Sequence, residues 1–110
     1  MVDLPDSFAG LTGFQWDEGN SEKNWQTHSV TRAEAEQAFL NRPVVVAEDV
    51  KHAKTEPRSA LLGRTDADRH LFVAFTVRGS EIRVISSRPI GRRERRIYAA
   101  AIKEEAEADS

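Results

Sequence analysis

The stretch Arg78–Tyr98, RGSEIRVISSRPIGRRERRIY, decides the fold of this chain. Gly79-Ser80 predicts a tight turn, because glycine adopts turn conformations that other residues avoid. The segment after it, Glu81–Ser87, alternates apolar and polar side chains as a strand does. A break at Arg88-Pro89 ends that strand, and a helix is expected to begin near Gly91. The stretch therefore predicts the second strand of a hairpin, followed at once by a C-terminal helix.

The same stretch concentrates positive charge. It holds seven arginines against two glutamates, a local formal charge of +5, whereas the whole chain of 110 residues has a formal net charge of −2. The acids lie elsewhere, with five acids and no base in residues 1–22 and four acids and one lysine in residues 99–110. Arginine grips phosphate or carboxylate through paired hydrogen bonds. RNA phosphates and the acidic surface of another protein are therefore both candidate partners.

Composition excludes several classes of protein. The chain has no cysteine, so it has neither disulfides nor thiolate metal ligands. Its histidines at 28, 52 and 70 lack the spacing of a ligand pair on a helix, so we expect no metal and no other cofactor. No apolar run approaches the ~20 residues of a membrane span, and the N-terminus lacks a signal-peptide pattern. We expect a cytoplasmic protein without a membrane partner.

Two helices are expected before the sheet. Asp17 can cap a first helix over residues 17–28. Thr31 and Glu34 have the spacing of a capping box, in which a hydroxyl and a carboxylate bond each other's backbone N–H groups. This pattern predicts a second helix over residues 32–41, ended by Pro43.

The strands are expected to form a meander. They are predicted over Pro43–Asp49, Arg58–Arg64, His70–Arg78 and Glu81–Ser87, with a short edge strand at Phe14–Trp16 and a possible bulge at Gly63. The fold class is α+β: an antiparallel sheet of about four strands plus the short N-terminal strand, with two N-terminal helices and a C-terminal helix. We expect one domain over residues 14–103, an irregular extension at 1–13 and an acidic tail at 104–110.

The alternation of the last strand predicts which way its arginine points. Ile82, Val84 and Ser86 should face one way, and Arg83, Ile85 and Ser87 the other. Burying an unpaired charge is costly, so Arg83 is expected on an uncovered face of the sheet. The helix that follows should turn toward the sheet with Glu94, Ile97, Tyr98, Ala101 and Ile102. We therefore expect a one-sided sheet whose open face is lined by arginine.

Short stretches along the chain match a known family in order and at family spacing. They are Phe14-x-Trp16-Asp17, Lys23-Asn24-x-x-x-His28-x-Val30, Glu34-Ala35, Glu48-Asp49-x-x-His52-x-x-x-Glu56-x-Arg58, Leu62-Gly63-Arg64-Thr65, Arg83-x-Ile85-Ser86-x-Arg88 and Glu94-Arg95-x-x-Tyr98. Over residues 14–98 the chain resembles BrnT, the toxin of a type II toxin–antitoxin pair, whose fold is RelE-like. Asn20, Thr27 and Ser29 depart from the family, which often has lysine, lysine and glycine at these positions.

The resemblance implies a metal-independent endoribonuclease that cleaves RNA and inhibits translation. In RelE-like toxins the 2′-hydroxyl of the RNA attacks the adjacent phosphate and leaves a cyclic phosphate. The resemblance also implies a BrnA-like ribbon-helix-helix antitoxin that neutralises the toxin, with operator DNA contacted only through that antitoxin. The alternative is a non-catalytic, degenerate toxin acting as an antitoxin-binding corepressor, which the two missing lysines favour.

That chemistry requires cations around the phosphate and groups that transfer protons. The candidates for the phosphate are Arg64, Arg83 and Arg88, and those for proton transfer are His28 and Tyr98. Lys23 and Arg58 join Arg83 and Arg88 as RNA-binding candidates. Arg92, Arg93, Arg95 and Arg96 surround the last helix and are expected to bind the antitoxin.

Each candidate also has a structural interpretation. Arg83 and Arg88 can be solvated charges at the end of the strand or ion-pair partners of Glu94, and the Arg92–Arg96 run can be a solvated helix face. The imidazole of His28 can close a helix by bonding a backbone carbonyl, and Tyr98 can be a core aromatic. His52 is expected in a hydrogen-bonded cluster with Glu56 and Arg58, and His70 is expected on the surface without a role.

Overall fold

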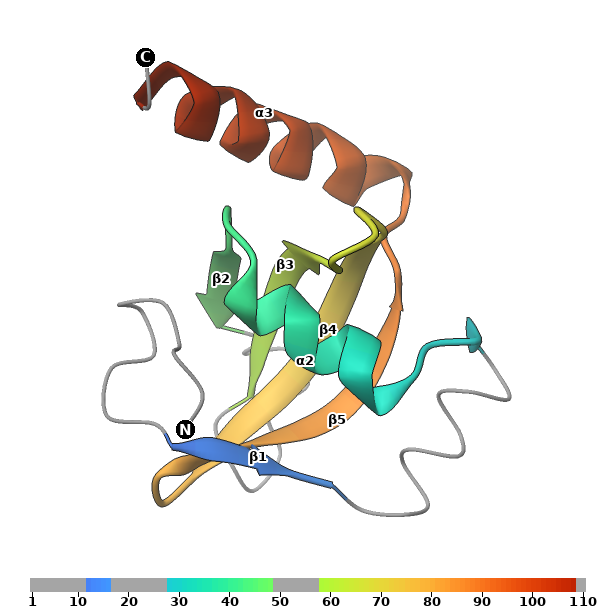
Figure 1. Cartoon of the computed structure of the whole chain (residues 1–110), viewed down its shortest axis with the longest axis vertical. Helices are drawn as coiled ribbons and strands as arrows, with labels where there is room; N and C mark the ends of the chain where they lie inside the picture. The colour runs from blue at the N-terminus through green and yellow to red at the C-terminus, as the bar shows by residue number, and fades with distance from the viewer. Residues whose placement is uncertain (1–11, 17–27, 49–57, 109–110) are drawn as a thin grey trace.

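A five-stranded sheet lies at the centre of the computed structural model, which describes residues 12–16, 28–48 and 58–108 (Figure 1). The sheet has the strand order β1-β5-β4-β3-β2. Along the chain the elements are β1 (Gly13–Gln15), α2 (Arg32–Leu40), β2 (Val45–Glu48), β3 (Ser59–Arg64), β4 (His70–Arg78), β5 (Glu81–Pro89) and α3 (Arg92–Ala108).

Most of the pairing agrees with the predicted meander. β2–β3, β3–β4 and β4–β5 are antiparallel, and Gly79 makes the hairpin turn with a φ of 60°. β1, however, runs parallel to β5, with Phe14 opposite Ile82, so the prediction of an antiparallel sheet is wrong at this edge. β1 and β5 are far apart in the chain, and no short turn between them sets their direction.

The predicted capping box of α2 is confirmed. The backbone N–H of Glu34 donates to Thr31 Oγ1 at 3.1 Å, and the backbone N–H of Thr31 donates to Glu34 Oε1 at 3.0 Å. The helix predicted over residues 17–28 lies outside the described residues except at its last position. His28, that last position, is helical. α2 and α3 are the two helices whose bounds are described, and neither is long and apolar enough to cross a membrane.

One face of the sheet is covered by α2. The helix buries Ala35, Ala38 and Phe39 against strand residues Leu61, Val73, Phe75, Ile82 and Val84. The Phe39 ring meets the rings of Phe14 and Phe75 edge-on, at centroid distances of 5.3 and 5.1 Å. Edge-to-face geometry is favoured between aromatic rings, so Phe39 ties the edge strand to the centre of the sheet.

Gly63 has a packing role and makes no bulge, contrary to the prediction. β3 pairs with β4 in continuous register through Gly63. A Cβ at this position would overlap the backbone carbonyl of Ala38 in α2. Glycine is therefore required here because the backbone of the helix lies directly on the strand.

The bulge of this sheet lies in β5. Phe75 pairs with Val84, whereas its neighbour Ala74 pairs with Ser86, so Ile85 is the extra residue. An extra residue reverses the alternation of side chains beyond it. Ser87, fully buried, therefore joins Val84 on the α2 face, which corrects the prediction that Ser86 would do so.

The opposite side of the sheet, called the second face below, is covered at one end by α3. Tyr98 of α3 is fully buried with Leu62 and Ile90, and Phe72 and Ile102 pack around them. The prediction of a one-sided sheet is thus wrong, since Leu62 and Phe72 place apolar surface on the second face that α3 covers. Figure 1 shows α3 crossing the end of the sheet.

The helix departs from the prediction in two further respects. Ile97, expected to face the sheet, is 49% exposed. The helix also continues to Ala108, through part of the expected acidic tail, and Glu105 pairs with Arg42 at 2.6 Å. One buried tyrosine and its apolar neighbours therefore anchor a long and largely exposed helix.

Replacement of Gly63 by alanine should destabilise the protein. We expect Gly63→Ala to lower the free energy of unfolding by at least about 2 kcal/mol, because a backbone carbonyl must move to make room. Gly13→Ala is the control, since its Cβ would meet only Glu81 Oε2, at an ordinary 3.6 Å. Urea unfolding of both variants tests this, and equal stabilities would contradict the close approach of α2.

Candidate functional site

Three of the candidate cations share the second face of the sheet. In register, Arg64 pairs with His70 and Arg83 pairs with Thr76. Arg88 pairs with Phe72, whose ring belongs to the cluster under α3. Positions 83 and 88 differ in parity, so Arg83 and Arg88 lie on the same face only because of the bulge at Ile85.

The three arginines nevertheless lie at two separate positions along the strands, called levels below. Arg83 is opposite Thr76, whereas Arg64 is opposite His70, six residues away along β4. At about 3.3 Å per residue, the two levels are about 20 Å apart. Arg88 lies only two residues, or about 7 Å, from the level of His70. The structure brings Arg64 and Arg88 to the end of the sheet near α3 and leaves Arg83 at the hairpin end.

Arg88 is held by the first turn of α3. Its NH1 and NH2 donate to the two carboxylate oxygens of Glu94 at 2.9 and 2.8 Å. The guanidinium carbon lies 4.1 Å above the centre of the Phe72 ring. The backbone N–H of Gly91 donates to the same carboxylate at 2.6 Å, so Glu94 caps its own helix while fixing the arginine.

These hydrogen bonds change the acidity of Glu94. The paired N–H donors of Arg88 hold the pKa of the Glu94 carboxyl below its ordinary value, against the opposing effect of burial. The same pairing raises the pKa of Arg88. With a 37% exposed side chain, Arg88 is both an ion-pair partner of Glu94 and a group that solvent reaches.

A second ion-pair cluster lies on the neighbouring strands. Asp68 Oδ1 is 3.1 Å from His70 Nε2 and 3.4 Å from Arg64 NH1. The imidazole of His70 meets the Tyr98 ring edge-on at a centroid distance of 4.9 Å. His70 is therefore fixed by strand pairing, by an aromatic ring and by a carboxylate.

The turn between β3 and β4 places that carboxylate. Asp68 has a φ of 64°, a left-handed conformation in which Asp and Asn are enriched among residues other than glycine. The turn is closed by the Thr65 side chain, whose Oγ1 accepts from the Arg69 backbone N–H at 3.0 Å. Asn41, at the end of α2, donates to the Arg64 carbonyl at 3.0 Å and to Asp66 Oδ1 at 2.9 Å. The turn is thus bound to the helix on the far side of the sheet.

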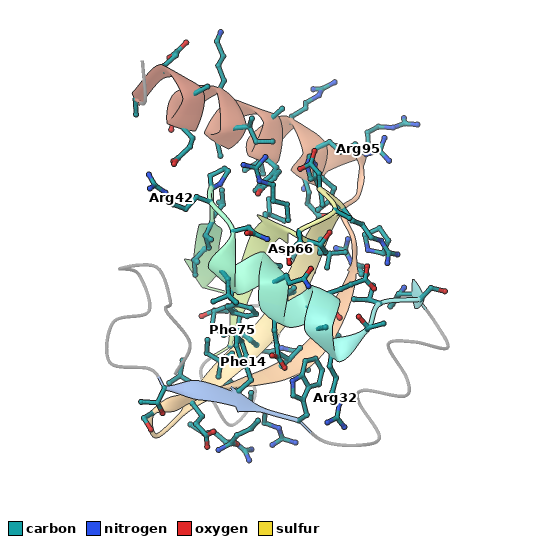
Figure 2. All side chains as sticks on the ribbon, in the orientation of Figure 1. Phe14, Arg32, Arg42, Asp66, Phe75 and Arg95 are labelled. Carbon is teal, nitrogen blue, oxygen red and sulfur yellow. The ribbon has the colours of Figure 1, made fainter. Side chains whose placement is uncertain are left out.

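Two adjoining hollows lie at this end of the molecule. The first, of about 350 Å³, is lined by Asn41, Arg42, Arg64, Thr65, Asp66 and Asp68. The second, of about 270 Å³, is lined by Asp68, His70, Pro89, Ile90 and Arg95. They meet at Asp68 and are together called the α3 groove below. Three of the residues that line it, Arg42, Asp66 and Arg95, are labelled in Figure 2. Within the described ranges, no three His, Asp or Glu side chains gather as a metal-ion site.

Tyr98 occupies a structural position. Its hydroxyl donates to the backbone carbonyl of Pro43 at 2.8 Å, and the residue is fully buried. Burial raises the pKa of Tyr98 to about 12. A role in proton transfer stays a prediction, and this geometry favours the interpretation as a core aromatic.

His28 lies with the beginning of α2. Its backbone carbonyl accepts from Arg69 NH2 at 3.1 Å, and Arg69 NH1 donates to the Ser29 carbonyl at 2.8 Å and to Glu34 at 3.1 Å. These bonds fix its main chain on the α2 side of the molecule rather than in the α3 groove. The catalytic role of His28 therefore stays a prediction.

Some of the remaining candidate residues are described by the structure and others are not. Arg58 directly precedes β3, and its buried Nε has no hydrogen-bond partner among the described residues. Lys23, His52 and Glu56 lie outside the described residues. The four antitoxin-binding candidates, Arg92, Arg93, Arg95 and Arg96, are all exposed on α3. Of these four, Arg95 lines the α3 groove.

The sequence interpretation overlooked His70 and Asp68. His70 was expected on the surface without a role, yet it lies between Asp68 and the Tyr98 ring. The sequence pattern could have indicated this cluster, because a short turn between two antiparallel strands places the residues that flank it opposite each other. Arg64 and His70 flank this turn, and Asp68 lies within it.

A comparison with protein families identifies the family of this chain. The family described as "Ribonuclease toxin, BrnT, of type II toxin-antitoxin system" matches residues 16–94. The chain belongs to the BrnT family. The resemblance seen in the sequence is thereby confirmed. The matched range contains Arg64, His70, Arg83 and Arg88, whereas Tyr98 lies beyond it.

A solved structure shows the same fold. The 1.1 Å crystal structure of the Brucella abortus ribonuclease toxin BrnT is 21% identical to this chain and superimposes with a TM-score of 0.55, over 74% of this chain and 99% of that chain. The likeness supports an α+β BrnT fold built on a mixed sheet. Among curated protein sequences, none matches the chain.

Loss of the Glu94 charge should destabilise the protein in a pH-dependent way. We expect Glu94→Gln to lower the free energy of unfolding by about 1–2 kcal/mol at pH 7, the range for a partly exposed charged hydrogen bond. The folded-state pKa of Glu94 is depressed, so its contribution is complete above the ordinary glutamate pKa of about 4.3. That contribution disappears as the pH falls through the folded-state pKa.

Urea unfolding at pH 7 and at about pH 3 measures this difference. The exposed Glu104 on the same helix provides the control variant Glu104→Gln, which should stay within about 0.5 kcal/mol of wild type. A difference between Glu94→Gln and wild type that persists unchanged at low pH would contradict the role of the charge.

Proposed function

We propose that this chain is an endoribonuclease that cleaves RNA without a metal ion and thereby inhibits translation. Membership of the BrnT family supports a ribonuclease toxin of a type II toxin–antitoxin system. The observation that carries the proposal is the grouping of Arg64, Arg83 and Arg88 on one face of the sheet. A line of arginines on a strand surface suits a single-stranded polyanion.

The two levels suggest two roles for the arginines, one in catalysis and one in binding the RNA strand. Arg64 and Arg88, at the α3 end, are the candidates for stabilising the extra charge of a pentavalent phosphate. Arg83, about 20 Å away, holds a neighbouring part of the RNA strand, together with Arg58. In this chemistry the 2′-hydroxyl attacks the adjacent phosphate and leaves a cyclic phosphate. His28 and Tyr98 stay the proton-transfer candidates from the family resemblance.

The partner that we propose is a BrnA-like ribbon-helix-helix antitoxin, with operator DNA contacted only through it. Type II toxins are neutralised by a protein, and α3 offers it a largely exposed surface. Its arginines 92, 93, 95 and 96 are exposed, and Ile97 beside them is 49% exposed. An acidic segment with an apolar anchor would complement this surface.

One observation favours the corepressor alternative. Arg88 is paired with Glu94 and Arg64 with Asp68, so each of these two cations already faces a carboxylate. A phosphate must therefore compete with those carboxylates or bind beside them. A toxin without catalysis would still present α3 to the antitoxin.

Cleavage assays with arginine variants distinguish these functions. Arg64→Ala and Arg88→Ala should lower kcat for RNA by about 100-fold, because they remove transition-state charge stabilisation. Arg83→Ala should instead act mainly on KM, since it lies at the distant level. Free RNA and mRNA on translating ribosomes should both be used as substrates.

Arg32→Ala is the matched control, since Arg32 lies on α2 on the other side of the sheet. It loses a cation–π contact with Trp16 on that side and should cleave RNA as wild type does. Folded wild-type protein that leaves both substrates intact but binds the antitoxin would establish the corepressor instead.

The antitoxin contact can be tested separately. The triple variant Arg92→Glu, Arg93→Glu, Arg96→Glu should weaken antitoxin binding by at least about 100-fold, because like charges replace complementary ones. Its RNA cleavage should be retained, since these arginines lie outside the α3 groove. Lys103→Glu is the control on the same helix, and calorimetry with the purified antitoxin measures both. Wild-type affinity in the triple variant would rule out this surface.

A further inference from the structure

We propose that His70 is the proton-transferring residue of the RNA-cleaving site and that Asp68 is its positioning residue. This inference rests on the proposed ribonuclease function and adds to it the group that removes the proton of the 2′-hydroxyl. It places the reacting phosphate in the α3 groove, beside Arg64 and Arg95.

The hydrogen bond to Asp68 determines which nitrogen of the neutral imidazole carries the proton. His70 Nε2 lies 3.1 Å from Asp68 Oδ1, and an ionised carboxylate only accepts hydrogen bonds. In the neutral ring the proton therefore sits on Nε2, and Nδ1 carries the lone pair. A neutral histidine oriented by a carboxylate is the arrangement that general bases use near neutral pH.

The ring is held where a substrate can reach it. The His70 side chain is 30% exposed and lines the same hollow as Arg95. The buried ring of Tyr98 supports the imidazole from one side at 4.9 Å. Tyr98 thus contributes to the site by positioning His70, which agrees with the bond between its own hydroxyl and Pro43.

The charges around the imidazole suit a phosphate. The groups that face it are Asp68, Arg64 across the strand pair, Arg95 from α3 and the neutral Tyr98. Two arginines and one aspartate give this group a net charge of +1 with neutral His70, and +2 once the ring is protonated. Positive charge therefore increases at the step in which the pentavalent phosphate gains negative charge.

The proposed reaction is a transesterification at the phosphate. His70 Nδ1 takes the proton of the 2′-hydroxyl, and the 2′-oxygen forms its bond to phosphorus. The bond from phosphorus to the 5′-oxygen of the next nucleotide breaks, and that oxygen takes a proton from water. The products are a 2′,3′-cyclic phosphate, a free 5′-hydroxyl and an imidazolium that returns its proton to solvent.

Rates of RNA cleavage across pH test the assignment. His70→Asn and His70→Gln should both lower the rate at pH 7 by about 100-fold or more, the usual contribution of a general base. The wild-type rate should rise with pH through the pKa of one group, and this acid limb should be absent in both variants. Two substitutions are used so that a folding defect in one does not decide the outcome.

Asp68→Asn tests the positioning role, because asparagine tolerates the left-handed conformation of Asp68. It should lower kcat by about tenfold and leave KM close to the wild-type value, because the imidazole loses the charged acceptor that orients it. Glu104→Gln removes the same charge from an exposed position of α3 that does not line the α3 groove. Its kcat should stay at the wild-type value.

A binding measurement complements the rates. Single-stranded DNA has the phosphates of RNA but no 2′-hydroxyl, so it occupies the site without reacting. We expect it to shift the NMR signals of the His70 ring nitrogens in wild-type protein and to leave those of His28 in place.

The outcomes separate the two proposals. Wild-type protein that cleaves RNA, with folded His70 variants that cleave equally well at every pH, would overturn the role of His70 and leave the ribonuclease function standing. Wild-type protein that cleaves neither free nor ribosome-bound RNA would overturn the proposed function and this inference with it.

Discussion

The bulge at Ile85 is the constraint on which the rest of the structure depends. Before it, even-numbered residues of β5 such as Ile82 and Val84 enter the core against α2; after it, Arg88 faces the other way. Without the extra residue the Arg88 guanidinium would point into an apolar core, at a large desolvation cost. The bulge therefore allows one strand to fill the core with its first half and to carry its second arginine on the second face.

Arg88 then determines where α3 begins. Its ion pair with Glu94 lies in the first turn of the helix, and the guanidinium stacks on Phe72. From that start the helix reaches Tyr98, which fills the space above Leu62. The α3 groove exists because the helix is anchored by these few contacts and crosses the end of the sheet, where the β3–β4 turn meets it. Arg88, which helps to anchor α3, is thus also a candidate for binding the phosphate.

The site also shows how strand geometry limits sequence interpretation. The arginines at 64, 83 and 88 suggested a single cluster, but strand rise separates Arg83 from Arg64 by about 20 Å. The same pairing brings together residues that motif spacing had left apart. His70 pairs with Arg64 and contacts Asp68 and Tyr98. The α3 end therefore holds a histidine and an aspartate beside its arginines, which the arginine pattern alone did not indicate. The hairpin end holds Arg83, a candidate for binding RNA.

The sequence by itself determined the elements whose signals are local. The capping box at Thr31, the glycine turn at Gly79 and the apolar strand His70–Arg78 were predicted correctly, because each depends on residues a few positions apart. Only the tertiary structure decided the parallel edge strand, the bulge, the side of the sheet that α3 covers and the contact of His70 with Asp68. These depend on packing between segments distant in the chain, where local propensity carries no information about direction, parity or partner.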